Sequence, residues 1–152
     1  MLDETFPDTL KEAQVVENKI ADFFKSEGWE TIFSEKPNWK YYDIAIEKDG
    51  IKYLVEIKNQ KSTEQTNKCV IERSCNNKPS GITTTKADIW IEVIHCYDHI
   101  VRYYYTSVKN LKKKIEEKRY KTIRAGGNIN TRTSLYVFYY EDYKTFFKEF
   151  KI

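Results

Sequence analysis

Two carboxylates and one ammonium group are spaced so that a β-hairpin would bring them together. Two runs of β-forming residues flank Asp49-Gly50, and this dipeptide is a strong signal for a two-residue type I′ turn. The register that the turn sets, carried along both strands, pairs Asp43 with Glu56. Side chains that face each other directly have Cβ atoms about 4.5–5.5 Å apart. Lys58 follows Glu56 by two positions and therefore lies on the same face of its strand.

The chemistry of this trio is that of a divalent metal site. Two like charges at such a distance repel each other, so the pair of Asp43 and Glu56 gives the sheet no stability by itself. A divalent cation between the two carboxylates would remove the conflict, because carboxylate oxygens are ligands that Mg²⁺ prefers. The hairpin therefore predicts a metal site with the ammonium group of Lys58 beside it.

This arrangement resembles the motif of the PD-(D/E)xK nuclease superfamily, here Tyr42-Asp43 followed by Glu56-Ile57-Lys58. Tyr42 stands where the motif has its nominal proline. The resemblance implies that Asp43 and Glu56 bind Mg²⁺, with Mn²⁺ as a substitute, and that the carbonyl of Ile57 is a third ligand. It implies that Lys58 is the cation beside the attacking water. It also implies an α/β fold, with a restriction-endonuclease-like central mixed β-sheet flanked by α-helices.

The first element expected to support this site is a helix over residues 9–27. Thr9 and Glu12 form a capping-box pattern, and Gly28 is a suitable C-terminal stop. Glu17 falls on the apolar stripe of this helix, where a carboxylate is unusual because charged side chains are rarely buried without a partner. It either extends from the edge of the stripe to solvent or points at the metal site. Many nucleases of the resembled superfamily carry such a glutamate on the first helix, and Glu17 matches it in place.

A second supporting segment is 76–90, which is rich in turn formers and hydroxyl groups. Its sequence resembles a region that follows Glu-x-Lys in phage- and virus-type small single-domain members of the superfamily. It is either an ordinary surface loop or a loop that holds a DNA phosphate. The residues expected to bind the phosphate are Ser80, Thr84, Thr85 and Lys86. Gln60 lies two positions beyond Lys58 and is a further candidate for phosphate contact, while Glu72 is either an extra acidic group or a solvated strand residue.

Positive charge concentrates in the last third of the chain. Residues 107–119 predict a basic helix capped by Ser107, whose charges are by default a solvated face. The segment 120–133 has cations, no acidic residue and a Gly-Gly pair, and it is expected to be a loop that contacts DNA phosphates. The cations proposed for these contacts are Lys121, Arg124 and Arg132.

The remaining pattern predicts a sheet and one more helix. Further strands are expected at 31–33, 68–74, 89–94, 100–106 and 135–140. A final helix is expected at 141–150. His95 and His99 have no Cys or second His at ligand spacing, so we expect both to be structural.

Length and composition set the outer limits. At 152 residues the chain is expected to be one domain, 1–152. Its 26 basic and 23 acidic residues give a net charge of +3, so a nucleic-acid surface must come from local clustering. The three cysteines form no CxxC pair, which argues against a zinc site and for reduced thiols. Neither a secretory signal nor a membrane-length apolar run is visible, so we expect an intracellular protein, cytoplasmic or nucleoid-associated and compatible with a viral gene, with no membrane partner.

The leading function hypothesis is a Mg²⁺-dependent DNA endonuclease that hydrolyses phosphodiester bonds. A restriction, homing or repair enzyme or a junction resolvase would fit the same core, and a homodimer would match a two-fold DNA substrate. The alternative is a non-catalytic DNA-binding or assembly module on the same fold. A third class is a small interaction protein such as an inhibitor, in which the charges of the hairpin are surface ion pairs.

Overall fold

The structure is a computed structural model that describes residues 5–126 and 132–152 of the chain. The helices and short helical turns are α1 (Thr5–Ser26), η1 (Asn38–Lys40), α2 (Thr63–Thr66), η2 (Gly81–Thr83), α3 (Val108–Glu116), α4 (Tyr140–Tyr143) and η3 (Lys144–Phe146). The strands are β1 (Glu30–Phe33), β2 (Ile44–Lys48), β3 (Ile51–Gln60), β4 (Lys68–Cys75), β5 (Lys78–Pro79), β6 (Ile89–His95), β7 (Val101–Ser107), β8 (Thr122–Gly126), β9 (Thr133–Tyr139) and β10 (Lys148–Phe150).

These strands form two sheets. The larger has six strands in the order β1-β2-β3-β6-β7-β10, and the smaller has four in the order β5-β4-β9-β8. In the larger sheet β3 and β6 run parallel, whereas its other neighbouring strands are antiparallel. The predicted α/β fold with a central mixed sheet is therefore confirmed.

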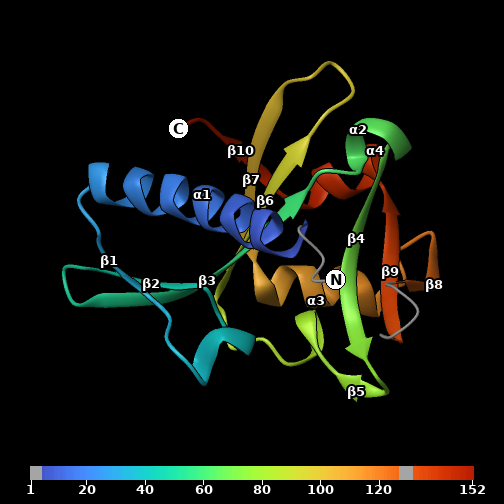
Figure 1. The fold of residues 1–152 in the computed structure, drawn as a ribbon, viewed down its shortest axis with the longest axis horizontal. Coiled ribbons are helices and arrows are strands. Elements are labelled where there is room, and N and C mark those ends of the chain that lie inside the picture. Colours follow the sequence, from blue (N-terminus) through green and yellow to red (C-terminus); the bar gives the residue numbers. More distant parts are fainter. Residues whose placement is uncertain (1–4, 127–131) are drawn as a thin grey trace.

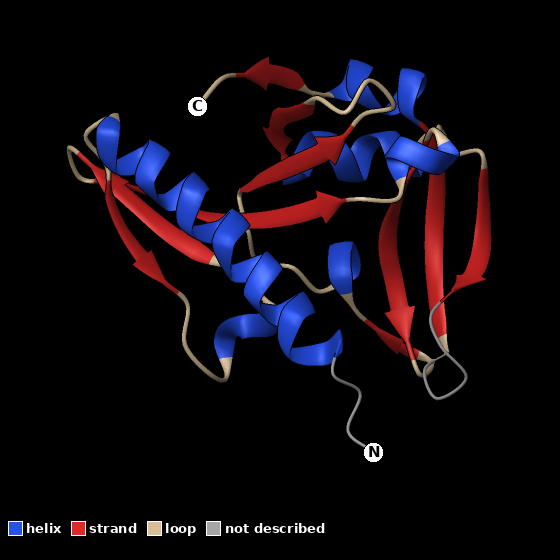
Figure 2. Ribbon diagram, turned by 45° about the horizontal axis from the view of Figure 1, so that its top comes forward, coloured by secondary structure: helices blue, strands red, loops and turns tan. Residues whose placement is uncertain are grey.

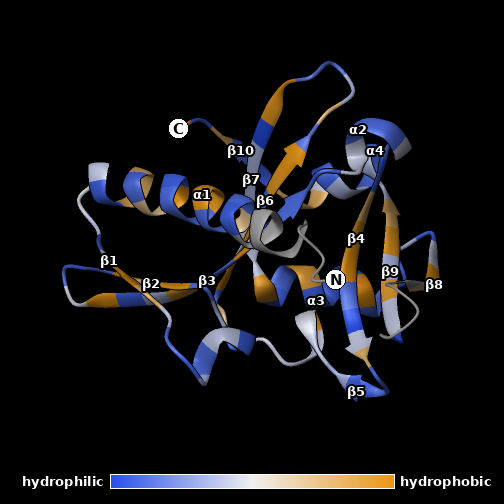
Figure 3. Ribbon diagram, in the orientation of Figure 1, coloured by the Kyte–Doolittle hydropathy of each residue, from blue (hydrophilic) through white to orange (hydrophobic). Residues whose placement is uncertain are grey.

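Two apolar cores hold the layers together. On one face of the six-stranded sheet, Ile20 of α1 packs with Ile44, Val55 and Ile91. The other face packs against α3, α4 and the smaller sheet. Figure 1 shows α1 lying across the six-stranded sheet with β4 and β9 to the right, and Figure 2 shows the same arrangement by element type. Figure 3 shows that hydrophobic residues concentrate along β6 and the β2–β3 hairpin, which contribute to these cores.

The predicted hairpin is confirmed together with its register. Asp49 and Gly50 have φ angles of 52° and 77°, and both central residues of a type I′ turn need positive φ. Lys48 pairs with Ile51, and the ladder continues to the pair of Ile44 and Val55. The β2 strand ends there, one residue short of Asp43.

The helices predicted at 9–27 and 107–119 are confirmed in existence and corrected in their bounds, to Thr5–Ser26 and Val108–Glu116. The first helix begins at Thr5 and not at Thr9, so the expected cap lies inside the helix; the side chain of Thr9 is outside the described residues. Gly28 follows the helix with a φ of +90°, which agrees with a C-terminal stop. The cap of α3 is confirmed, because the backbone N–H of Asn110 donates to Ser107 Oγ at 3.0 Å.

Two predictions about the last third of the chain are wrong. Residues 141–150 do not form one helix: α4 and η3 end at Phe146, and Lys148–Phe150 pair with β7 as strand β10. The segment 120–133 is not simply a loop, since Thr122–Gly126 form β8 and pair with β9. Residues 127–131 lie outside the described part of the chain.

Candidate active site

Asp43 lies in the loop just before β2, next to the part of β3 that contains Glu56. Asp43 donates its backbone N–H to Val55 O at 2.9 Å. Its carboxylate Oδ2 accepts a hydrogen bond from the N–H of Ile57 at 2.7 Å. Asp43 therefore bonds to the residues on either side of Glu56, Val55 and Ile57, but it lies beyond the last paired residue of β2, so the predicted pairing of Asp43 with Glu56 is not part of the ladder.

Glu56 and Lys58 project from the face of β3 opposite to α1. The Glu56 side chain is buried, and Lys58 Nζ lies 3.1 Å from Glu56 Oε1. The second oxygen, Oε2, is buried and has no hydrogen-bond partner among the residues that the structure describes. A buried carboxylate oxygen without a partner is costly, so a ligand at this position would relieve an unfavourable state.

The electrostatics of the trio follow from burial and mutual proximity. Burial raises the pKa of Glu56 to about 7, and the neighbouring Asp43 adds to the rise, while Lys58 opposes it. Burial also raises the pKa of Asp43, against the Ile57 N–H and Lys58. For Lys58, burial alone would lower the pKa, but the surrounding carboxylates outweigh it and raise the pKa. Lys58 is therefore held in its charged form.

Glu17 belongs to this carboxylate cluster. Burial raises its pKa to about 7, and the charges of Asp43 and Glu56 raise it further, whereas Lys58 lowers it. Helix α1 thus brings a half-buried third carboxylate within electrostatic reach of the hairpin pair. A role for Glu17 in the chemistry of the site stays a prediction.

A pocket of 310 Å³ opens above Glu56 and Lys58. It is lined by Trp39, Lys40, Tyr41, Glu56, Lys58, Glu72, Pro79, Ser80, Gly81 and Thr84. The loop on its far side packs directly on β4, because a Cβ atom at Gly81 would lie 2.2 Å from Glu72 O, and Gly81 has a φ of +56°. Only glycine fits this close approach. Gly81 therefore holds the loop against β4, and this places its neighbours Ser80 and Thr84 at the pocket.

The other two residues predicted in that loop have different surroundings. Thr85 Oγ1 donates to Tyr41 O at 3.0 Å and accepts from the N–H of Ala87 at 3.1 Å, so it fastens the loop. Lys86 is exposed, and its Nζ lies 4.1 Å from the centroid of the Tyr41 ring. Thr85 is therefore a structural residue of the loop, while Lys86 does not line the pocket itself but lies against Tyr41, which does.

The position of Gln60 does not suit the phosphate contact expected for it. Its side chain is buried. Its Nε2 donates to Val70 O at 2.7 Å, and its Oε1 accepts from the N–H of Val70 at 3.2 Å. Gln60 thus ties β3 to β4 across the two sheets, and we correct its role to a structural one.

The basic residues of the C-terminal segment lie on the smaller sheet. Lys121 precedes β8, Arg124 lies within it, and Arg132 precedes β9; all three are exposed. Lys121 Nζ lies 5.4 Å from the centroid of the Tyr139 ring. None of the three lines the pocket of Glu56, so their contact with DNA stays a prediction about a more distant surface.

The sequence interpretation missed Glu92, the register partner of Lys58 on β6. Glu92 is 0% exposed, and its Oε1 accepts hydrogen bonds from Trp90 Nε1 at 2.8 Å and from the hydroxyl of Tyr143. Burial raises its pKa to about 7, against these hydrogen bonds. A glutamate in the middle of the apolar run Ile89–Ile94 was the signal that could have revealed it.

The aromatic side of the pocket was missed as well. Trp39, Lys40 and Tyr41 line it, although the sequence indicated only a loop before the hairpin. A tryptophan and a tyrosine among lysines, just before a candidate metal ligand, was the available signal.

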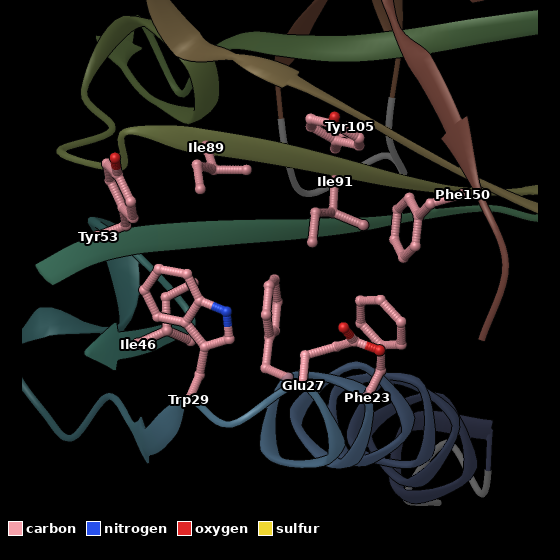
Figure 4. A pocket seen from close by; sticks show the side chains of 10 residues that line it. Phe23, Glu27, Trp29, Ile46, Tyr53, Ile89, Ile91, Tyr105 and Phe150 are labelled. Atoms are coloured by element: carbon pink, nitrogen blue, oxygen red, sulfur yellow. The ribbon is translucent and has the colours of Figure 1, made fainter. Parts of the chain in front are cut away.

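A second pocket, shown in Figure 4, lies on the α1 face of the sheet. Its volume is 290 Å³, and its lining is aromatic and aliphatic, with Glu27 as its one carboxylate. Ile46 and Ile91 line it from the sheet and belong to the core under α1. It has a single acidic group, so the pocket of Glu56 remains the candidate site.

The two carboxylates of Asp43 and Glu56 suit Mg²⁺ better than a metal ion that takes all of its ligands from the protein. No cluster of three or more His, Cys, Asp or Glu side chains with metal-holding geometry occurs in residues 5–126 and 132–152. Mg²⁺ usually takes one or two carboxylates and completes its shell with water and substrate phosphate. Asp43 and Glu56 supply two carboxylates. The carbonyl of Ile57 faces the same strand edge as its N–H, and that N–H points at Asp43.

Comparisons with known proteins add little to this geometry. No protein-family model matches the chain, and no curated protein matches it. Among solved structures, that of a bacterial homing endonuclease, I-Ssp6803I, is similar with a TM-score of 0.48 and 14% sequence identity. The match covers 63% of this chain and 66% of the other, so the chain spans about two thirds of that protein's length. Within the described residues, no helix is both long and apolar enough to cross a membrane.

Proposed function

We propose that this chain is a Mg²⁺-dependent DNA endonuclease of the PD-(D/E)xK type, which hydrolyses phosphodiester bonds. The observation that carries the proposal is the buried carboxylate of Glu56, with Lys58 Nζ at 3.1 Å from its Oε1 and the half-buried carboxylate of Asp43 bonded to the N–H of the next residue, Ile57. Burying two like charges next to each other is unfavourable for folding. Such an arrangement is common where a site must bind a cation or perform chemistry.

Asp43 and Glu56 would hold Mg²⁺, with Mn²⁺ as a substitute, together with the carbonyl of Ile57. When bound, the ion polarises the phosphate and lowers the pKa of a water molecule. Glu56 Oε2 is one of four buried side-chain oxygens without a partner within the described residues, and Ser80 Oγ, which belongs to a residue lining the same pocket, is another. The hydrogen bond from the Ile57 N–H fixes the Asp43 carboxylate before any ligand arrives, and a ligand set that is already ordered binds at a lower entropic cost.

Lys58 would act as a cation and not as a base. In the metal-free site the surrounding carboxylates raise its pKa and so favour the charged ammonium form. From its place beside Glu56 it would orient the attacking water and offset the negative charge that develops on the phosphate.

Glu17 would complete the acidic side of the site, directly or through a water molecule. It comes from α1, while the other carboxylates come from the hairpin, so its position depends on how α1 packs on the sheet. Ile20, 0% exposed and one turn along the helix, anchors this packing.

Ser80, Thr84 and Lys86 are proposed to bind the phosphate backbone at the pocket. Hydroxyl and backbone N–H groups position a nucleic acid without reading its sequence. Cutting both strands of a duplex would need two sites, and a homodimer with two-fold symmetry would supply them. The molar mass of the chain in solution, with and without DNA, tests the dimer separately.

The experiment for the proposed function is a cleavage assay on linear duplex, supercoiled, branched and single-stranded DNA, each with Mg²⁺ and with EDTA. We expect cleavage in Mg²⁺ and none in EDTA. The non-catalytic DNA-binding module predicts binding without cleavage of any of the four substrates. An interaction protein of the inhibitor class predicts neither binding of DNA nor of divalent metal.

A further inference from the structure

Trp39 stands at the rim of the pocket that contains Glu56 and Lys58. Its side chain is 58% exposed, although tryptophan is among the residues that gain most from burial. Its Nε1 donates to Ser34 O at 2.9 Å. The indole is therefore held in one orientation while much of its ring stays open to solvent.

Three lysines surround this aromatic rim. Lys36 Nζ lies 4.9 Å from the centroid of the Trp39 ring. Lys40 Nζ and Lys86 Nζ lie 5.0 Å and 4.1 Å from the centroid of the Tyr41 ring. All three lysines are exposed, so one side of the pocket combines aromatic rings with positive charge.

This combination is the one that proteins use to bind single-stranded nucleic acid. Lysines follow the phosphates, and an aromatic ring stacks on a base. In an intact duplex both faces of each base are already stacked, so an exposed ring gains this contact only from an unpaired base. An exposed tryptophan alone would be ordinary surface, but Trp39 shares its pocket with the proposed metal ligand Glu56.

We propose that Trp39 stacks on an unpaired base next to the scissile phosphate, while Lys36, Lys40 and Lys86 bind phosphates of the same strand. The substrate class is then DNA with a single-stranded segment, such as a single strand, a flap or a branched junction, rather than uninterrupted duplex. This inference rests on the proposed function, because it takes the pocket of Glu56 as the place of cleavage.

The test is a comparison of binding without metal, in EDTA, so that no cleavage occurs. The probes are a fluorescent oligothymidylate of about 12 nucleotides, within the range of single-strand site sizes, and a duplex of the same length. Trp39→Ala should weaken binding of the single strand roughly 5- to 100-fold, from the loss of one stacked base. Duplex binding should change less than about twofold, since no base stacks there.

Matched variants separate stacking from folding. Tyr97→Ala removes an aromatic ring that is 73% exposed in the turn between β6 and β7, and it should leave both affinities unchanged. Trp39→Phe should restore part of the single-strand affinity. The intrinsic fluorescence of Trp39 is obtained as the difference between wild type and Trp39→Phe, in which the signals of Trp29 and Trp90 cancel. It should be quenched by the single strand, because the indole would stack on a base.

The outcomes distinguish this inference from the proposed function. If Trp39→Ala weakens single strand and duplex equally, or neither, the inference is overturned even when wild type cleaves DNA in Mg²⁺. If single-strand binding depends on Trp39 but no substrate is cleaved, the binding surface is supported and the nuclease assignment fails.

Discussion

At the residue scale, the central feature is a lysine that carboxylates keep charged. Glu56, Asp43 and Glu92 all raise the pKa of Lys58, and its ammonium group also lies 5.7 Å from the centroid of the Trp90 ring. An experiment on Lys58 must therefore distinguish two roles of its positive charge, an effect on the reacting phosphate and an effect on metal binding.

Lys58→Ala should retain metal binding and lose most turnover. We expect the cleavage rate to fall roughly a hundredfold or more, because one preorganised charge at a transition state contributes about that much. Lys52→Ala, an exposed lysine of the same strand that pairs with Glu47, is the control and should cleave normally. Calorimetric titration with Mg²⁺ is the second measurement, and a loss of metal affinity without a loss of turnover at saturating metal would make Lys58 structural.

Glu17→Gln tests the carboxylate of α1. The amide keeps the volume and the polar character of the side chain but removes its charge, so we expect the cleavage rate to fall roughly tenfold, as for residues that support a metal site indirectly. Asp22→Asn removes an exposed charge from the same helix and should have no effect. Equal rates for Glu17→Gln and wild type would return Glu17 to the edge of the apolar stripe.

At the element scale, local turn chemistry and register were predictable, and pairing between distant segments was not. Asp49-Gly50 specified the hairpin and its register as far as the pair of Ile44 and Val55, one residue short of Asp43. The final helix was predicted from apolar spacing, but Phe150 instead lies in β10 against Tyr103 of β7, with ring centroids 5.9 Å apart. A tertiary partner decided that segment, and a sequence pattern does not contain the partner.

The same limit explains the misassigned site residues. Gln60 has the parity of Glu56 and Lys58, so the strand pattern placed it on the face of the site. The smaller sheet covers this end of β3, and the backbone of Val70 takes both hydrogen-bonding groups of the Gln60 amide. The alternation of side chains along a strand predicts which face a residue lies on, but it does not predict which other element packs against that face.

Glu92 on β6 gives the two-sheet core a dependence on pH. Its folded-state pKa of about 7 lies above its ordinary value of 4.5. Ionisation is therefore harder in the folded than in the unfolded chain. The cost is absent below pH 4.5, grows as the pH rises through about 7 and is complete above that. Hydrogen bonds from Tyr143, Trp90 and Gln60 and the positive charge of Lys58 all favour the ionised form of Glu92. The cost of burying the charge outweighs these four contributions.

Glu92→Gln should remove this cost. Its carbonyl can still accept from Trp90 and Tyr143, so the variant should gain stability relative to wild type as the pH rises from 4.5 to above 7. The gain should approach about 3 kcal/mol, at about 1.4 kcal/mol per pKa unit. Denaturant unfolding of both proteins across this range measures it, with Cys69, the nearby buried thiol on β4, kept reduced. A stability difference that does not vary with pH would mean that Glu92 does not titrate in this range.

At the scale of the whole molecule, the two basic surfaces predict different DNA footprints. Exposed Lys121, Arg124 and Arg132 follow the smaller sheet, whereas Lys112 and Lys113 lie on α3. Each phosphate contact contributes about 0.9 to the slope of log affinity against log salt on duplex DNA. The triple replacement of Lys121, Arg124 and Arg132 by Ala should flatten that slope by about two to three units and weaken binding to every sequence.

The matched control for this experiment is Lys112→Ala combined with Lys113→Ala, which should leave the slope unchanged. The opposite pattern, with the slope altered only by the α3 variant, would move the duplex footprint to that helix. A change of cleavage site preference at constant slope would mean that the three residues of the smaller sheet read bases.

The proposed activity depends on Asp43 and Glu56 being metal ligands, and the most direct measurement is Mg²⁺-dependent DNA cleavage by Asp43→Asn and Glu56→Gln. Each variant should cut at least about a thousandfold more slowly than wild type, because metal assistance supplies several kcal/mol. Each should also stay folded with equal or slightly higher stability, because one of two neighbouring like charges is removed. Glu47→Gln, an exposed carboxylate of the same hairpin, should cut as fast as wild type. Cleavage in Mg²⁺ at the wild-type rate by both Asp43→Asn and Glu56→Gln would contradict the account.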